Sequence, residues 1–142
     1  MKIQKYDIAI IGCGISGIFA GYELIKEDPS LRIVMFDQGN DIYNRNCPAI
    51  KLKDRDCINC KTCSIMRGFG GAGAFSDGKF NFTTEFGGWL NDYIPDEEVM
   101  ELLYYVDRVY VAFGATTEKH SAFTKEAAEI EKKALENDLH LL

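Results

Sequence analysis

The first forty residues alternate between short apolar runs and one amphipathic segment. Residues 6–11 (YDIAII) form an apolar run that stops at a glycine, which is typical of a buried parallel strand. From Ile15 to about Lys26, apolar side chains recur every three to four positions and predict an amphipathic helix. Residues 31–36 (LRIVMF) predict a second strand. The order strand, glycine turn, helix, strand indicates a βαβ unit in residues 1–40.

The rest of the chain falls into two regions of different pattern. Residues 41–91 are irregular and rich in cysteine and glycine, with five glycines in the twelve positions 67–78, too many for the interior of a helix or strand. Residues 92–142 carry two amphipathic stretches, which predict two helices with Asp96 and Thr124 as their capping residues.

These elements predict an α/β fold of the Rossmann type. An open sheet of this type usually has about five or six strands, whereas the pattern predicts two. We therefore expect residues 1–142 to be the amino-terminal part of an incomplete domain of this type.

Charge and hydropathy narrow the class of partner. The net charge is −6, and residues 92–142 alone carry twelve acidic and five basic side chains, so nucleic-acid binding is not expected. Residues 41–80 carry seven basic and four acidic side chains, a local excess of positive charge that could bind an anionic cofactor.

The chain has no apolar run of about 20 residues that would span a membrane, and its start lacks the pattern of a signal peptide. We expect a cytoplasmic protein.

The glycine turn after the first strand follows the pattern G-x-G-x-x-G. Its glycines allow a tight turn, a close approach of backbone to pyrophosphate and close packing of helix on strand, while the helix amino terminus offers N–H groups to phosphate. Asp37 ends the second strand, where a carboxylate can accept hydrogen bonds from ribose hydroxyls and would repel the 2′-phosphate of NADP. The pattern does not separate FAD from NAD, and an ordinary tight turn is the alternative. The candidate cofactor-binding residues here are Gly12, Gly14, Ile15, Ser16, Gly17, Asp37 and Gln38.

A second glycine-rich loop follows at residues 68–79. Its backbone N–H groups could reach a ligand without hindrance from side chains, with a serine as donor and a lysine as positive charge. A flexible surface loop is the alternative. The candidate residues are Gly70, Gly71, Gly73, Ser76 and Lys79.

Both glycine segments carry a resemblance to known flavoproteins. YDIAIIGCGISG and MFDQG resemble the opening of FAD-dependent oxidoreductases of the NAD(P)/FAD superfamily, and GFGGAGAFSDGKFNFTTEFGG resembles a family of predicted FAD-dependent dehydrogenases. The resemblance implies FAD, with its pyrophosphate at the first turn, its ribose at Asp37, and the second loop on the pyrophosphate and flavin side. It also implies a longer protein whose further domain binds a small-molecule substrate, so this chain alone is expected to be inactive.

Four cysteines lie in the irregular region, three of them spaced C-x-x-C-x-x-C. This spacing can supply three ligands of a [4Fe–4S] cluster, with a remote cysteine as the fourth. Zinc fits the spacing less well; free thiols and a C-x-x-C redox disulfide also remain open. The candidate metal ligands are Cys47, Cys57, Cys60 and Cys63. A fifth cysteine, Cys13, lies in the glycine turn and is expected to be structural.

The sequence thus predicts the FAD-binding portion of a flavin-dependent dehydrogenase. Two alternatives stay open: an NAD-binding dehydrogenase domain, and an iron–sulfur or flavin electron-transfer module that acts with a partner protein. The second glycine loop favours FAD over the first alternative, and the absence of a second C-x-x-C group in the sequence weakens the second.

Overall fold

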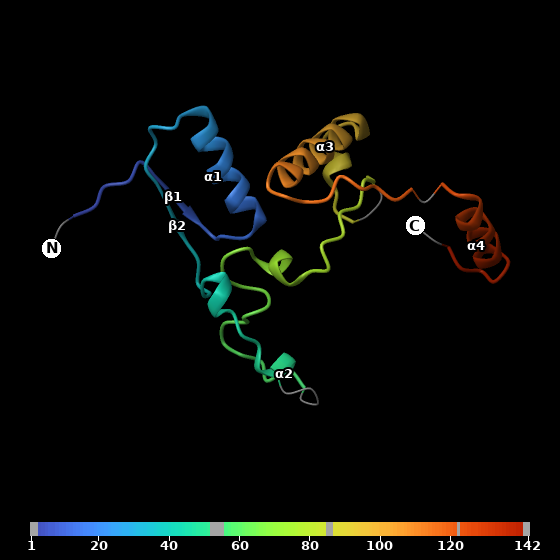
Figure 1. Ribbon diagram of the computed structural model, residues 1–142, viewed down its shortest axis with the longest axis horizontal. Coiled ribbons are helices and arrows are strands. Elements are labelled where there is room, and N and C mark those ends of the chain that lie inside the picture. The colour runs from blue at the N-terminus through green and yellow to red at the C-terminus, as the bar shows by residue number, and fades with distance from the viewer. Residues whose placement is uncertain (1–2, 52–55, 85–86, 122, 141–142) are drawn as a thin grey trace. The chain divides into compact units, whose positions relative to one another are not determined.

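The computed structural model describes residues 3–51, 56–84, 87–121 and 123–140 (Figure 1). The chain divides into two compact units, residues 1–79 and residues 80–142. The division after Lys79 falls inside the segment 41–91 that the sequence pattern groups together. Each unit is described by itself.

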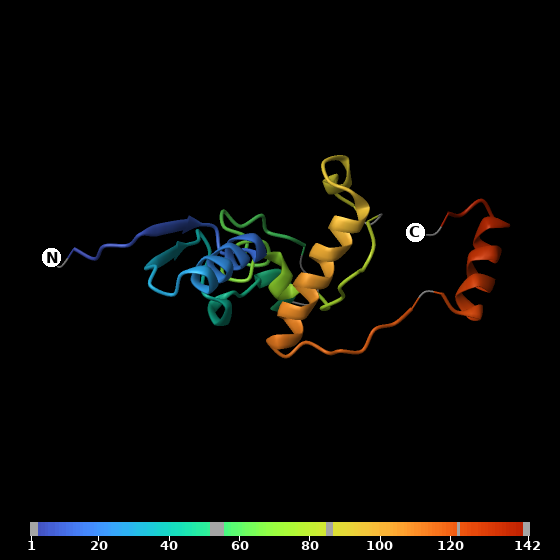
Figure 2. The ribbon, with the colours of Figure 1, turned by 90° about the horizontal axis from the view of Figure 1, so that it is seen from above.

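The first unit contains the βαβ arrangement. Strand β1 spans Ile8–Ile11, helix α1 spans Ile15–Glu27 and strand β2 spans Ile33–Phe36. The two strands pair in parallel, with Ile8 opposite Ile33. Both views place α1 alongside the strands (Figures 1 and 2). The predicted strand, helix and strand are confirmed, although each strand begins two residues later than predicted.

The sheet of the first unit has one open face. Within the described ranges it consists of β1 and β2 alone. Helix α1 packs on one face, where a Cβ at the buried Gly21 would lie 3.4 Å from Ile10 and 3.6 Å from Met35. On the other side Ile11 is 80% exposed and Phe36 is 54% exposed. A parallel α/β unit is therefore present, and the larger Rossmann-type sheet stays a prediction.

The segment after β2 is irregular, as the sequence predicts. It holds a 3₁₀ turn at Ile42–Asn44 (η1) and a short helix at Pro48–Lys51 (α2). The glycine-rich stretch contains a second 3₁₀ turn, Ala72–Phe75 (η2). Local helical structure therefore does form inside this stretch, although for one turn only.

The second unit consists mainly of helices. Its elements are a 3₁₀ turn at Leu90–Asp92 (η3), helix α3 at Asp96–Ala112 and helix α4 at Lys125–Leu135. Asp96 is the first residue of α3, with Pro95 at the capping position and no side-chain cap, so the capping role predicted for Asp96 is wrong. Pro95, with a φ of −59° and a ψ of 149°, has the extended backbone of a capping residue, so Asp96 already lies within the first turn.

The cap predicted for the last helix is confirmed. The hydroxyl of Thr124 accepts a hydrogen bond of 3.1 Å from the N–H of Ala127 at the start of α4.

None of the helices in the part of the chain that the structure describes is long and apolar enough to cross a membrane.

Candidate functional site

The first glycine turn has the backbone shape that its sequence predicts. Strand β1 ends at Ile11, and Gly12 has a φ of +101°, a region that favours glycine. Helix α1 begins three residues later with Gly14 at its capping position and with no side-chain cap and no acidic residue in its first turn. The first N–H groups of α1, at Ile15 and Ser16, therefore have no capping side chain and no carboxylate within their own helical turn to compete with an anion.

Gly17 makes this turn possible. It lies in the first turn of α1, and a Cβ built on it would overlap the carbonyl oxygen of Gly12 and lie 3.3 Å from the side chain of Ile10. Only a residue without a side chain lets the helix start this close to the strand that precedes it. The third glycine of the pattern thus has the packing role expected of it.

The second glycine loop lies directly against the first turn. The N–H of Gly70 donates a 2.9 Å hydrogen bond to the carbonyl of Cys13. Gly71 has a φ of +57°, and a Cβ on it would lie 3.0 Å from the Cα of Gly14. Two segments more than fifty residues apart in the sequence therefore meet backbone to backbone at the amino terminus of α1.

Arg45 holds the second loop in this position. Its side chain is only 5% exposed. Its guanidinium donates four hydrogen bonds of 2.5 to 2.8 Å to backbone carbonyls and stacks over the ring of Phe75 with a distance of 4.7 Å to the ring centre. The four carbonyls belong to Ser64, Ile65, Phe69 and Gly71. One buried cation thus replaces the hydrogen-bond partners that a helix or sheet would give this loop.

Asp37 joins the end of β2 to the glycine turn. One carboxylate oxygen accepts a 2.8 Å hydrogen bond from the N–H of Cys13, and the other accepts one of 2.8 Å from the N–H of Gly39. The N–H groups of Cys13 and Gly39 hold the pKa of the Asp37 carboxyl below its ordinary value. The carboxylate is therefore both a structural link and a negative charge at the strand end.

This pKa shift predicts a specific acid sensitivity. Because the pKa of Asp37 is lower in the folded chain than in the unfolded chain, the ionised carboxylate stabilises the fold above about pH 4, near the unfolded pKa. That stability is lost as the pH falls through the lower, folded pKa. Asp37→Asn should remove this part of the acid dependence, measured by urea unfolding at a series of pH values. Asp92→Asn, at an exposed position, is the control; an unchanged acid dependence in Asp37→Asn would contradict the role assigned to Asp37.

The other predicted cofactor residues are placed less closely around the turn. The side-chain oxygen of Gln38 accepts a 3.1 Å hydrogen bond from Arg67. Gly73 is exposed, and a Cβ on it would meet nothing within 4 Å. Ser76 accepts a hydrogen bond from the N–H of Gly78, and Lys79 pairs with Asp77 at 3.2 Å. The structure thus brings Gly70 and Gly71 to the first turn, while the recorded contacts of Ser76 and Lys79 are local.

The candidate metal ligands are not gathered into a metal site. Within the described ranges, no group of three or more histidine, cysteine or acidic side chains is placed to hold a metal ion. All five cysteines have free thiols, and Cys57 and Cys60 are exposed. The N–H groups of Met66 and Ile65 lower the pKa of the Cys63 thiol, whereas burial raises the pKa of the Cys13 thiol. The fully buried Cys13 accordingly has the structural character expected of it.

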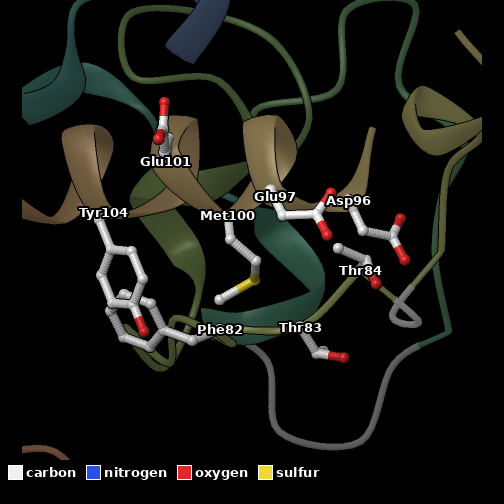
Figure 3. A pocket seen from close by; sticks show the side chains of 8 residues that line it. All are labelled: Phe82, Thr83, Thr84, Asp96, Glu97, Met100, Glu101 and Tyr104. Carbon is white, nitrogen blue, oxygen red and sulfur yellow. The ribbon is translucent and has the colours of Figure 1, made fainter. Parts of the chain in front are cut away.

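The second unit carries a groove of different chemistry. It has a volume of about 560 Å³ and lies between α3 and the chain at residues 82–84. Figure 3 shows Met100 and Tyr104 extending from α3 toward Phe82, while Glu101 points to another side of the helix. The carboxylates of Asp96 and Glu97 in its lining disfavour the phosphates of a dinucleotide. The groove therefore does not compete with the glycine turn as a phosphate site.

Sequence reasoning missed Arg45 as a site residue. A single basic residue in an irregular stretch produces no periodicity, and its partners lie 19 to 26 residues away in the chain. The available signal was indirect: a glycine loop without helix or strand partners needs another donor for its carbonyls.

The stretch 68–88, which carries the resemblance to FAD-dependent dehydrogenases, also includes Glu85 and Phe86, and these two lie outside the described residues.

The glycine turn has a counterpart in known folds. A glycine turn between a parallel strand and a helix amino terminus is the arrangement that receives phosphate groups in nucleotide-binding folds.

Among known proteins, the chain is similar to the mitochondrial L-2-hydroxyglutarate dehydrogenase of Dictyostelium discoideum, with 49% identity over 37 residues. The match covers 26% of this chain and 8% of that enzyme. No family model and no solved structure matches the chain.

Proposed function

We propose that this chain is the FAD-binding portion of a flavin-dependent dehydrogenase, in a Rossmann-type domain. The observation that carries the proposal is the contact of the second glycine loop with the first turn, through Gly70 and Cys13 and through Gly71 and Gly14. An ordinary tight turn needs no second glycine segment against it. The short similarity to a dehydrogenase supports the same reaction class.

The residues present fit an ADP-containing cofactor. Gly17 and Gly71 let strand, helix and loop pack closely, because a Cβ at either position would crowd neighbouring backbone. Ile15 and Ser16, the first residues of α1, are exposed. Gly14, Ile15 and Ser16 would lie against the pyrophosphate, where the helix dipole and the N–H groups favour negative charge. When bound, FAD supplies the hydride-accepting chemistry of a dehydrogenase.

Asp37 can bind a ribose in addition to its structural contacts. An ionised carboxylate offers about four acceptor positions; the N–H groups of Cys13 and Gly39 bind it directly, and the N–H of Gly68 also faces it. A remaining lone pair can accept a ribose hydroxyl. Its negative charge, kept by the lowered pKa, repels the 2′-phosphate of NADP.

A direct comparison of cofactors tests the proposal. Titration of the chain with FAD, followed by quenching of the flavin fluorescence, should give saturable binding that ADP displaces. NAD should bind at least about tenfold more weakly than FAD, a difference of about 1.4 kcal/mol. The affinity for FAD is expected to be modest, because the sheet face that carries the exposed Ile11 and Phe36 is not covered by another element in the described residues. If NAD bound more tightly than FAD, the result would favour the alternative of an NAD-binding dehydrogenase domain and contradict the proposal.

A further inference from the structure

A pair of thiols precedes the second glycine loop. Cys60 and Cys63 have the spacing C-x-x-C, both are free, and Cys60 is exposed while Cys63 is half-buried. Asn59, just before the pair, has a φ of +51°, a conformation that is uncommon outside glycine. Two cysteines three positions apart on an irregular segment can form a disulfide without disrupting a helix or a strand.

The segment of Cys63 is tied to the second glycine loop. The carbonyl of Cys63 accepts a 2.9 Å hydrogen bond from the N–H of Arg67, the residue before that loop. Arg45 donates to the carbonyls of Ser64 and Ile65, which directly follow Cys63, and with the same guanidinium to Phe69 and Gly71. A conformational change at Cys63 would therefore displace the carbonyls of Ser64 and Ile65, which are bound to the same Arg45 guanidinium as the carbonyls of the loop.

We propose that Cys60 and Cys63 form a reversible disulfide, and that its formation alters the second glycine loop through Arg45. The oxidant is a small-molecule disulfide such as oxidised glutathione. One cysteine thiolate attacks it, forms a mixed disulfide and releases one glutathione thiolate. The other cysteine thiolate then attacks the protein sulfur of the mixed disulfide and releases the second glutathione. The protein loses two electrons and two protons, and one glutathione disulfide becomes two thiols.

The choice of Cys63 over the other cysteines rests on its surroundings. Cys57 also has a C-x-x-C relation to Cys60, but its sulfur lies 3.8 Å from the side-chain oxygen of Asn59, and both are exposed. Cys63 is the cysteine of the spaced triplet that directly precedes the residues held by Arg45. A disulfide at Cys63 therefore acts on the loop, whereas one between Cys57 and Cys60 would not.

The disulfide is tested by mass mapping of the purified chain. After equilibration in glutathione buffers of decreasing reducing strength, the free thiols are blocked with a maleimide and the chain is digested. The expected product contains a Cys60–Cys63 disulfide and has a mass lower by two hydrogens than its reduced form. Dithiothreitol should restore the two thiols. Cys57→Ser should keep it, and Cys63→Ser should lose it. A Cys57–Cys60 disulfide, or thiols that stay protected by bound iron or zinc, would overturn the proposal.

The coupling to the loop has a separate readout that needs no cofactor. In the Cys57→Ser variant, oxidation should change amide hydrogen exchange at Gly70 and Gly71 by at least about threefold, because the hydrogen bonds around Arg45 are rearranged. Exchange at Ile10 and Met35, which are paired residues of strands β1 and β2, should stay constant. Unchanged exchange at Gly70 and Gly71 in a chain with a mapped disulfide would overturn the coupling. Both measurements are independent of whether FAD binds.

Discussion

Gly17→Ala should abolish FAD binding and destabilise the first unit. The added methyl group would overlap the backbone carbonyl of Gly12, which cannot move without opening the turn, and would press on the side chain of Ile10. Overpacking of this kind costs about 1–3 kcal/mol, and the overlap with a backbone carbonyl places Gly17→Ala at the upper end of that range. Because the first turn of α1 must shift, its N–H groups would no longer point at a pyrophosphate.

Gly73→Ala is the matched control for this substitution. Gly73 belongs to the second glycine loop, but a Cβ there would meet nothing within 4 Å. We expect its unfolding free energy and its FAD affinity to stay within about 0.5 kcal/mol of the parent chain. Urea unfolding and flavin fluorescence measure the two quantities. Equal behaviour of Gly17→Ala and Gly73→Ala would contradict the packing assigned to Gly17.

Arg45→Ala should have the second large effect. It removes the donor of four backbone carbonyls together with the cation stacked on Phe75. Buried acceptors that lose their donor cost about 1–3 kcal/mol each; since the loop can relax and admit water, we expect a loss of about 3 kcal/mol in total. Gly70 and Gly71 would then leave the first turn. Arg45→Lys should not restore the loss, because a single ammonium cannot replace the planar fork of donors.

Arg32→Ala provides the control for Arg45→Ala. Arg32 forms a 3.0 Å ion pair with Asp7, but its side chain is 58% exposed. An exposed pair of this kind contributes little to stability, because water screens it. Urea unfolding followed by circular dichroism distinguishes the two arginines. A loss for Arg45→Ala as small as that for Arg32→Ala would show that Arg45 does not hold the loop.

The first turn could be predicted from the sequence because its causes are local. The run before Gly12, the periodicity after Ile15 and the spacing to Gly17 each follow from the geometry of a strand or a helix, and the structure confirms them. The charge of Asp37 was equally visible, but its bonds to Cys13 and Gly39 were not, because they depend on how the strand end folds back on the turn.

The parts that could not be predicted depend on contacts between distant segments. Arg45 is one polar residue among many in an irregular region, and its role appears only when the loop at 64–71 surrounds it. The cysteine spacing is a weaker guide, since the C-x-x-C-x-x-C pattern predicts metal ligands but the described residues show no group of three placed to hold a metal ion, so the metal site stays a prediction. Spacing along an irregular segment does not determine where the sulfur atoms point.

Amide chemical shifts report whether the two glycine segments form one FAD site. On titration of the isotope-labelled chain with FAD, residues 12–17 and residues 68–71 should shift together, with one common affinity. ADP should reproduce the shifts at the first turn. Shifts confined to the groove of the second unit, or the absence of shifts at both glycine segments, would contradict a shared FAD site.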